Sequence, residues 1–327
     1  MDTHTTQSGP SQPAQQREKI PLAISACLTG APVRHDGGHK RNSFCMERLA
    51  EFVDFIPVCP EVGIGLSTPR PSIRLQHSEG EIIARSRDGA DLTAALRAFG
   101  KQQAAQLGNI AGYIVAAKSP SCGMERVRVY HPSGMATRSG VGIFAETLMQ
   151  QRPELPVEED GRLNDPQLRE NFVTRLFVYH AWLKLNDDGL SAAGLIDFHS
   201  RCKFLLMAHS PVVYRRLGGL LADLSIDLQA ISSDYIRELM TTLKTPITRR
   251  NHTNVLQHLQ GYIKDRLSSP ERQALASNID HYRSGRLPLL APLTLIRHYL
   301  QVHPTPYIEQ QFYLQPHPES LCLRYAL

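Results

Sequence analysis

The sequence contains no apolar segment near the roughly 18 consecutive residues that a membrane-spanning helix needs. Its longest candidate, residues 287–296, is short and is interrupted by proline. The first 19 residues are polar and lack the apolar centre of a secretory signal peptide. Together these features predict a soluble, cytoplasmic protein.

The six cysteines include no CxxC pair and stand far apart, at positions 27, 45, 59, 122, 202 and 322. A chain of 327 residues in which 42% are hydrophobic can bury a core without disulfide bonds. In a reducing compartment such cysteines are free core thiols, metal ligands or nucleophiles, and their local contexts distinguish these roles.

Positive charge is only in small excess, with a formal net charge of +5. Residues 1–160 hold 17 Lys and Arg against 17 Asp and Glu, whereas residues 161–327 hold 19 against 14. An excess of this size is as consistent with ordinary surface charge as with an anionic partner. If an anionic partner exists, the asymmetry favours the second half as its binding site.

Two domains are expected from the change in periodicity along the chain. Strand and helix patterns alternate over 20–151, which predicts an α/β domain with a mostly parallel or mixed sheet. Residues 1–19 are predicted to be a disordered tail, and the proline-containing acidic stretch 152–166 a linker. Helical periodicity then predicts an all-α domain over 167–303, followed by a C-terminal tail at 304–327.

The patterns also predict individual elements. Strands are expected at residues 21–26, 55–58, 72–77, 81–85, 110–117 and 127–130, and helices of the first domain at 42–55, 91–107 and 141–151. Helices of the second domain are expected at 167–185, 191–209, 211–224, 229–243, 246–267, 270–284 and 289–302.

Three cysteines come at or soon after the ends of predicted strands: Cys27 ends PLAISAC, Cys59 ends FIPVC and Cys122 follows YIVAAKSPS. Because parallel strands end at one edge of a sheet, these thiols are expected to converge. The alternative is that each is a small buried hydrophobe. Three thiolates suit an iron–sulfur cluster or a zinc ion, and their wide spacing favours the cluster. Core or surface positions are expected for Cys45, Cys202 and Cys322.

The segments around the three strand-end cysteines resemble the TudS-type thiouracil desulfidases. These segments are SACLTGAPVRHDGGHK, PVCPEVGIGLSTPRP and KSPSCG. The second domain resembles the helical domain that is fused to TudS in the RudS enzymes, at residues 197–218, 248–264 and 282–300. The resemblance covers roughly residues 20–303. It implies [4Fe–4S]-dependent removal of sulfur from 4-thiouridine in tRNA, with the helical domain assisting tRNA binding.

The resemblance also implies that Cys27, Cys59 and Cys122 hold the [4Fe–4S] cluster, with an acid and a serine beside it. The acid aligns with Glu61, with Asp36 as the second choice, and the serine three positions before the last ligand is Ser119.

Replacement of C=S by C=O at C4 of a pyrimidine requires a thiophilic acceptor, an activated water and control of protons. We expect an iron atom without a protein ligand to bind the sulfur, while Glu61 removes a proton from the attacking water. Ser119 or Ser121 is expected to donate a hydrogen bond to the developing anion. No electron is transferred overall, and no GxGxxG motif is present. Neither a flavin nor a nicotinamide is therefore expected.

Basic side chains are predicted to contact the RNA backbone through charge, without reading its sequence. The predicted contacts are Lys118 in the first domain and Lys203, Arg215, Arg216, Arg249, Arg250 and Lys264 in the second.

Two alternatives remain open at this stage. One is desulfidation of free thiouracil or thiolated nucleotides, with the helical domain serving oligomerisation alone. The other is a non-catalytic iron–sulfur redox sensor. The acid and serine beside the ligand motifs favour an enzyme over a sensor, and the fused basic domain favours RNA over a free base.

Overall fold

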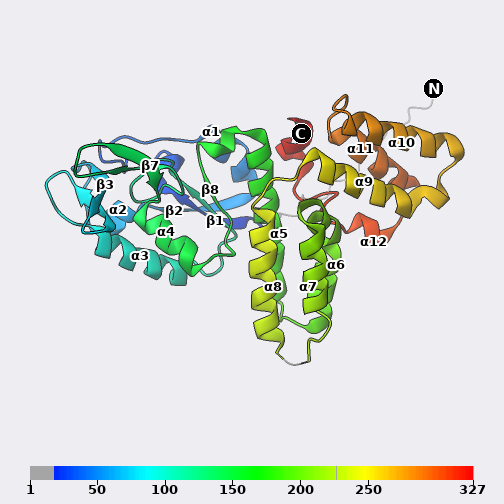
Figure 1. Cartoon of the computed structure of the whole chain (residues 1–327), viewed down its shortest axis with the longest axis horizontal. Coiled ribbons are helices and arrows are strands. Elements are labelled where there is room, and N and C mark those ends of the chain that lie inside the picture. Colours follow the sequence, from blue (N-terminus) through cyan, green and yellow to red (C-terminus); the bar gives the residue numbers. More distant parts are fainter. Residues whose placement is uncertain (1–17, 226, 327) are drawn as a thin grey trace, which may run out of the picture.

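The computed structural model describes residues 18–225 and 227–326 (Figure 1). The predicted disordered tail, residues 1–19, lies outside this range except for its last two residues. An α/β region is followed by a largely helical region, as the sequence predicts. In the described part of the chain, no helix combines the length and the hydropathy needed to cross a membrane.

The first sheet consists of four parallel strands in the order β2-β1-β5-β8. Its central strands, β1 (Ile20–Ser25) and β5 (Tyr113–Val115), are almost entirely buried, as continuous apolar runs in parallel sheets usually are. The edge strands are β2 (Val53–Val58) and β8 (Val157–Glu159). The strand expected at 110–117 is shorter in the structure, where only Tyr113–Val115 forms β5.

Strand β8 lies within residues 152–166, so the prediction of a linker there is wrong. All three of its residues are buried. The acidic composition that suggested exposure has another cause: Glu158 accepts a hydrogen bond of 2.6 Å from Arg162 and lies 3.7 Å from Arg175 of the helical region. Buried carboxylates that are paired in this way are compatible with an interior strand.

The second sheet is mixed, in the order β4-β3-β6-β7. Its strands are β3 (Ile73–Ser78), β4 (Glu81–Ser86), β6 (Val127–Tyr130) and β7 (Ala136–Gly140). The hairpin and β6 agree with the predictions. Strand β7 was not predicted, because its sequence ATRSG is polar and four of its five residues are exposed.

Short helices connect the strands and cover the sheets. Helices α3 (Thr93–Gln106) and α4 (Ile143–Gln151) are as expected. The helix predicted at 42–55 is wrong in length: α1 (Ser43–Glu47), capped by Asn42, is followed by a 3₁₀ turn and then by β2. Pairing of β2 with β1 along six residues outweighs the helical periodicity of its first positions.

The helical region contains all seven predicted helices. They are α5 (Pro166–Asp187), α6 (Ala192–His209), α7 (Pro211–Leu220), α8 (Leu228–Leu243), α9 (Arg249–Ile263), α10 (Ser269–Arg283) and α11 (Leu290–Val302). Most begin with a side chain that accepts a hydrogen bond from the first turn, such as Asp165 before α5 and Thr248 before α9. These caps explain why the sequence located the starts of the helices well.

Helix α5 stands between the two regions and packs against both (Figure 1). Gly112, just before β5, leaves room for Leu176 of α5: a Cβ atom at Gly112 would lie 3.2 Å from the Leu176 side chain. Further along α5, Trp182 packs edge-on against Phe198 of α6. A continuous hydrophobic core therefore runs from the first sheet into the helical region.

The described part of the predicted C-terminal tail, residues 304–326, packs into the helical region. It forms the short helix α12 (Pro306–Glu309) and buries Tyr313 completely. Its buried Arg324 donates a hydrogen bond of 2.9 Å to Glu170 of α5. The neighbouring guanidinium of Arg324 outweighs the effect of burial and holds the pKa of Glu170 well below its usual range.

Removal of Arg324 is expected to destabilise the protein strongly, because it leaves the Glu170 carboxylate buried without its counter-charge. For Arg324→Ala we expect a loss of about 3–5 kcal/mol in the free energy of unfolding, measured by urea titration. The matched control is Arg237→Ala, which removes an exposed ion pair with Asp234 and should cost less than about 0.5 kcal/mol. Equal effects of the two substitutions would contradict this account.

Candidate functional site

Three cysteines converge at the carboxyl edge of the first sheet. Strands β2, β1 and β5 are adjacent, and they lead into Cys59, Cys27 and Cys122 respectively. All three cysteines line one cavity of about 280 Å³. This volume is close to the lower end of small-molecule sites, at about 300 Å³. The other cysteines lie elsewhere: Cys45 and Cys202 are buried in the core and Cys322 is exposed.

The electrostatic surroundings of these thiols distinguish a ligand from a nucleophile. Burial raises the pKa of Cys122 to about 12. Burial, followed by the charge of Cys59, raises the pKa of Cys27 to about 11. A nucleophilic cysteine needs a lowered pKa, which neither thiol has. Thiols of this kind lose their protons when a bound cation compensates the negative charge, so the cavity is suited to metal ligation.

Strand β5 also carries a buried tyrosine, Tyr113. Tyr113 is completely buried, and its hydroxyl has no hydrogen-bond partner among the described residues. Burial raises its pKa well above the usual value, and the charges of Cys122, Cys59 and Cys27 add to this effect. An unpaired buried donor costs about 1–3 kcal/mol. Tyr113 does not line the cysteine cavity, and its ring packs edge-on against Phe144 of α4.

Three thiols are a donor set that an iron–sulfur cluster uses. Over residues 18–225 and 227–326, no three His, Cys, Asp or Glu side chains are arranged to hold one metal ion. The three thiols nevertheless line the same cavity. Thiolates distributed around a cavity are the usual ligands of iron–sulfur clusters.

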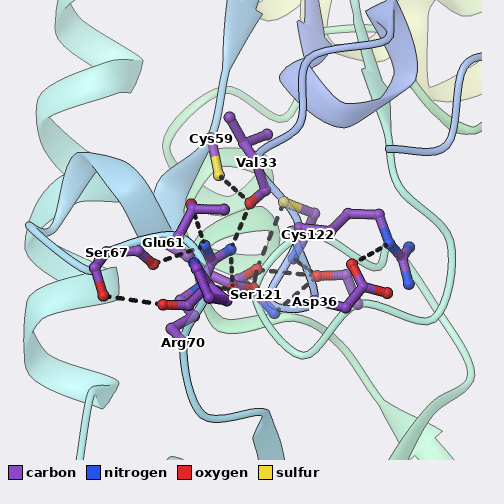
Figure 2. Close-up of polar contacts among 12 residues, drawn as sticks. Val33, Asp36, Cys59, Glu61, Ser67, Arg70, Ser121 and Cys122 are labelled. Carbon is purple, nitrogen blue, oxygen red and sulfur yellow. Dashed lines mark hydrogen bonds and ion pairs between the residues drawn. The ribbon is translucent and has the colours of Figure 1, made fainter. Parts of the chain in front are cut away.

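Glu61 and Arg70 form a buried ion pair beside the cysteines (Figure 2). Glu61, in the first turn of α2 (Pro60–Gly63), accepts a hydrogen bond of 2.7 Å at Oε2 from Nε of Arg70, and Nη2 of Arg70 lies 2.6 Å from the same oxygen. Its Oε1 accepts a hydrogen bond of 2.7 Å from Ser121. Nη2 of Arg70 also donates to the Val33 carbonyl at 2.8 Å. The pair therefore ties together the three loops that carry the cysteines.

Ser119 and Ser121 extend this network along the third loop. The Ser119 hydroxyl oxygen accepts hydrogen bonds from the backbone N–H of Cys122 at 3.1 Å and of Ser121 at 3.3 Å. The two serine hydroxyls lie 2.9 Å apart. Because Ser121 donates to Glu61, Ser119 is the donor of this contact. The result is a directed chain of hydrogen bonds from Ser119 through Ser121 to Glu61.

Asp36, the second choice for the acid, lies apart from the cavity. Its side chain is about half exposed, and it does not line the cavity. A backbone hydrogen bond from Gly38, of 3.0 Å, lowers the pKa of Asp36 and closes its own loop. The structure therefore brings Glu61, and not Asp36, to the cysteines.

Asp160 is a residue of this edge that the sequence analysis missed. It directly follows β8, as Cys59 follows β2, and it is buried. Its carboxylate accepts a hydrogen bond of 2.7 Å from the backbone of Ala117 and pairs with Lys40 at 2.8 Å. Asp160 could have been found from the sequence, because it follows a strand as Cys59 does. It was missed because residues 152–166 were predicted to be a linker.

The residues that are predicted to contact RNA lie in several separate parts of the structure. Lys118 lies at the rim of the cysteine cavity. In the helical region, Lys203 is surrounded by three aromatic rings, Arg216 pairs with an acid of α8, and Arg249 donates to a backbone carbonyl of α10. The other three, Arg215, Arg250 and Lys264, are exposed and have no acidic partner among the described residues.

The Ser119 contacts can be tested without any cofactor. In Ser119→Ala, the N–H groups of Ser121 and Cys122 lose their acceptor, so we expect faster amide exchange in residues 119–123, measured by mass spectrometry. The control is Ser67→Ala, whose hydroxyl donates to a carbonyl of an exposed loop. An exchange rate for residues 119–123 equal to that of the wild type would show that the hydroxyl does not order the loop.

Comparison with known proteins assigns both regions. Residues 22–160 match the 2-thiouracil desulfurase family, and residues 203–318 match the family described as "Protein of unknown function (DUF1722)". The solved structure of the [4Fe-4S]-dependent thiouracil desulfidase TudS is 28% identical and covers 45% of this chain and 95% of its own, with a TM-score of 0.35.

A curated relative matches half of this chain along almost its whole length. YbgA of Escherichia coli K12 is 37% identical over 166 residues, which is 50% of this chain and 98% of YbgA. The expected combination of a desulfidase domain and a following helical domain is confirmed. The chain therefore belongs to the same family as YbgA, and it joins a region that matches the 2-thiouracil desulfurase family to one that matches DUF1722.

Proposed function

We propose that this protein removes sulfur from 4-thiouridine in tRNA, producing uridine and hydrosulfide, and that Cys27, Cys59 and Cys122 hold a [4Fe–4S] cluster. The observation that carries the proposal is the convergence of the three thiols on one cavity that Glu61 and Ser121 also line. Membership in the thiouracil desulfurase family supports a thiolated pyrimidine as the substrate. A tRNA substrate would place the activity in the cytoplasm.

The overall reaction is a hydrolysis. The oxygen of one water molecule forms a bond to C4 and the C–S bond breaks. The sulfur leaves as hydrosulfide with one proton of that water, and the other proton is released. No electrons enter or leave. When bound, the cluster would supply a thiophilic Lewis acid.

The side chains of the cavity are arranged to handle the protons. Glu61 lines the cavity, and its side chain is 13% exposed. Both of its oxygens are engaged, one by Arg70 and the other by Ser121, so Arg70 fixes its orientation. We infer that a proton released from water reaches Glu61 through the Ser121 hydroxyl, which donates to the carboxylate and can accept from a molecule in the cavity.

Two features favour a nucleic acid over a free base as the partner. The chain carries a second, helical domain whose exposed basic residues include Arg215, Arg250 and Lys264. Lys118 lies at the entrance of the cysteine cavity, where a phosphate next to the bound base would pass. Free thiouracil or a thiolated nucleotide is the second candidate, because the family that residues 22–160 match is described as a 2-thiouracil desulfurase.

The proposal predicts activity on tRNA after anaerobic reconstitution with iron and sulfide. We expect loss of the 4-thiouridine absorbance of bulk tRNA together with release of sulfide. Cys59→Ala should abolish turnover and the brown colour of the cluster, whereas Cys322→Ala, which changes an exposed cysteine, should retain both. Turnover of free 4-thiouracil without turnover of tRNA would favour the second candidate. Full activity in Cys59→Ala would exclude the proposed cluster.

Ser121→Ala tests the proton path. It interrupts the hydrogen-bond chain but leaves the Glu61–Arg70 pair in place. We expect turnover to fall by about 10²-fold, at the lower end of general acid–base effects, with the iron content unchanged. Unchanged turnover would remove Ser121 from the path, and a parallel loss of iron would assign it a purely structural role.

A further inference from the structure

Four arginines lie side by side across the second sheet. Arg74 of β3 is directly opposite Arg85 of β4, and Arg128 of β6 is directly opposite Arg138 of β7. The parallel pairing of β3 with β6 places Arg74 next to Arg128, one position before the Leu75–Val129 pair. One residue of each strand thus contributes to a single row, called here the arginine row.

The row lies on the face of the sheet that is turned away from the core. Leu75 and Val129, the neighbours of two of these arginines, point to the other face and pack in the core with Leu96 of α3. Arg74, Arg128 and Arg138 are exposed. Their charges therefore face the outside of the molecule, on the side opposite to α3.

Such a row is unfavourable unless something compensates its charge. Like charges directly opposite each other on neighbouring strands destabilise a sheet. None of Arg74, Arg128 and Arg138 has an acidic partner among the described residues. At the end of the row, Arg85 interacts with the carboxylate of Asp91. Hydrogen bonds from Thr93 are the main reason why the pKa of Asp91 is lowered, and the charge of Arg85 adds a smaller effect. Three adjacent arginines are thus left for an external anion.

A groove joins the arginine row to the cysteine cavity. The groove has a volume of about 780 Å³ and is lined by Arg74, Arg128, Arg138 and the ring of Tyr130. Tyr130 also holds Arg74, whose guanidinium lies 5.6 Å from the ring centre. The groove and the cavity share several lining residues, namely Ser72, Ile73, Ala117, Lys118 and Pro120.

The acids of the groove do not cancel this charge. Glu125 is paired with Arg162 at 2.8 Å and with Arg126 at 3.7 Å, both of which also line the groove. Glu159 accepts a hydrogen bond of 2.8 Å from the backbone of Met124, and burial raises its pKa. The groove therefore keeps a net positive charge along the arginine row.

We propose that the arginine row binds the phosphodiester backbone of the RNA strand whose thiolated base enters the cysteine cavity; this inference rests on the proposed function. Guanidinium groups match phosphate oxygens in geometry and charge. An enzyme that acts on a base within a folded RNA must turn that base out of its stack. A continuous groove from the row to the cavity would hold the strand on either side of the extruded nucleotide. The α/β domain would then carry phosphate contacts that the charge count had assigned to the helical domain alone.

The test compares two double variants of the full-length protein. Arg128→Gln/Arg138→Gln removes two charges from the row, and Arg97→Gln/Lys101→Gln removes two exposed charges from α3, on the other side of the sheet. Affinity for bulk tRNA is measured by fluorescence anisotropy between 50 and 200 mM salt. For the row variant we expect weaker binding and a log–log salt slope smaller by about 1.4–1.8, at about 0.7–0.9 per lost phosphate contact.

The α3 variant should keep the affinity and slope of the wild type. The thermal midpoint of the row variant should not fall, because its substitutions relieve repulsion between opposed charges, and this excludes misfolding as the cause of weaker binding. Equal slopes for both variants would overturn the assignment. Failure of the proposed function would give another result. The wild type would then bind tRNA with a salt slope that decreases in the row variant, but it would not remove sulfur from the tRNA. A wild type that does not bind tRNA would overturn the inference.

Discussion

The ion pair between Arg70 and Glu61 is the constraint on which the arrangement of the site depends. The side chain of Arg70 is 4% exposed and that of Glu61 13% exposed, so both charges have lost most of their water. A buried ion pair is favourable only when the remaining donors and acceptors are also satisfied. Here they are: Arg70 donates to the carbonyls of Val33 and Ser67, and Glu61 accepts from Ser121. Each of the three cysteine loops thereby contributes one partner, which fixes the separation of the thiols.

Much of this site was predictable, because it depends on local rules. Strand ends in a parallel sheet share an edge, and this rule alone brought Cys27, Cys59 and Cys122 together. The helices of the second domain followed from their periodicity and caps. Strand β8 escaped detection because its composition does not show that Glu158 is paired with Arg162 and with Arg175 of the helical region. The role of Arg70 was not predicted, because its pairing with Glu61 depends on how the loop between them folds.

Helix α5 explains how two domains of different class form one body. It begins beside β8, packs Leu176 into the space left by Gly112, and continues into the helical core at Trp182. The C-terminal segment then returns to the same helix through Arg324 and Glu170. Because the core is continuous through α5, the helical region is held at a fixed position relative to the cysteine cavity. An RNA bound to the helical region would therefore meet the cavity in a defined geometry.

Charge counts along the sequence conceal the distribution of charge in space. The first 160 residues contain equal numbers of basic and acidic residues, which suggests a neutral domain. In the folded chain, however, several of the acids, such as Glu61 and Asp160, are buried beside their own cations. Three arginines of the row, Arg74, Arg128 and Arg138, are exposed and have no acidic partner among the described residues. Folding thus converts a neutral composition into a positive face next to the cavity. Only strand register reveals this, since the four arginines are spread over more than 60 positions of the sequence and become neighbours through cross-strand pairing.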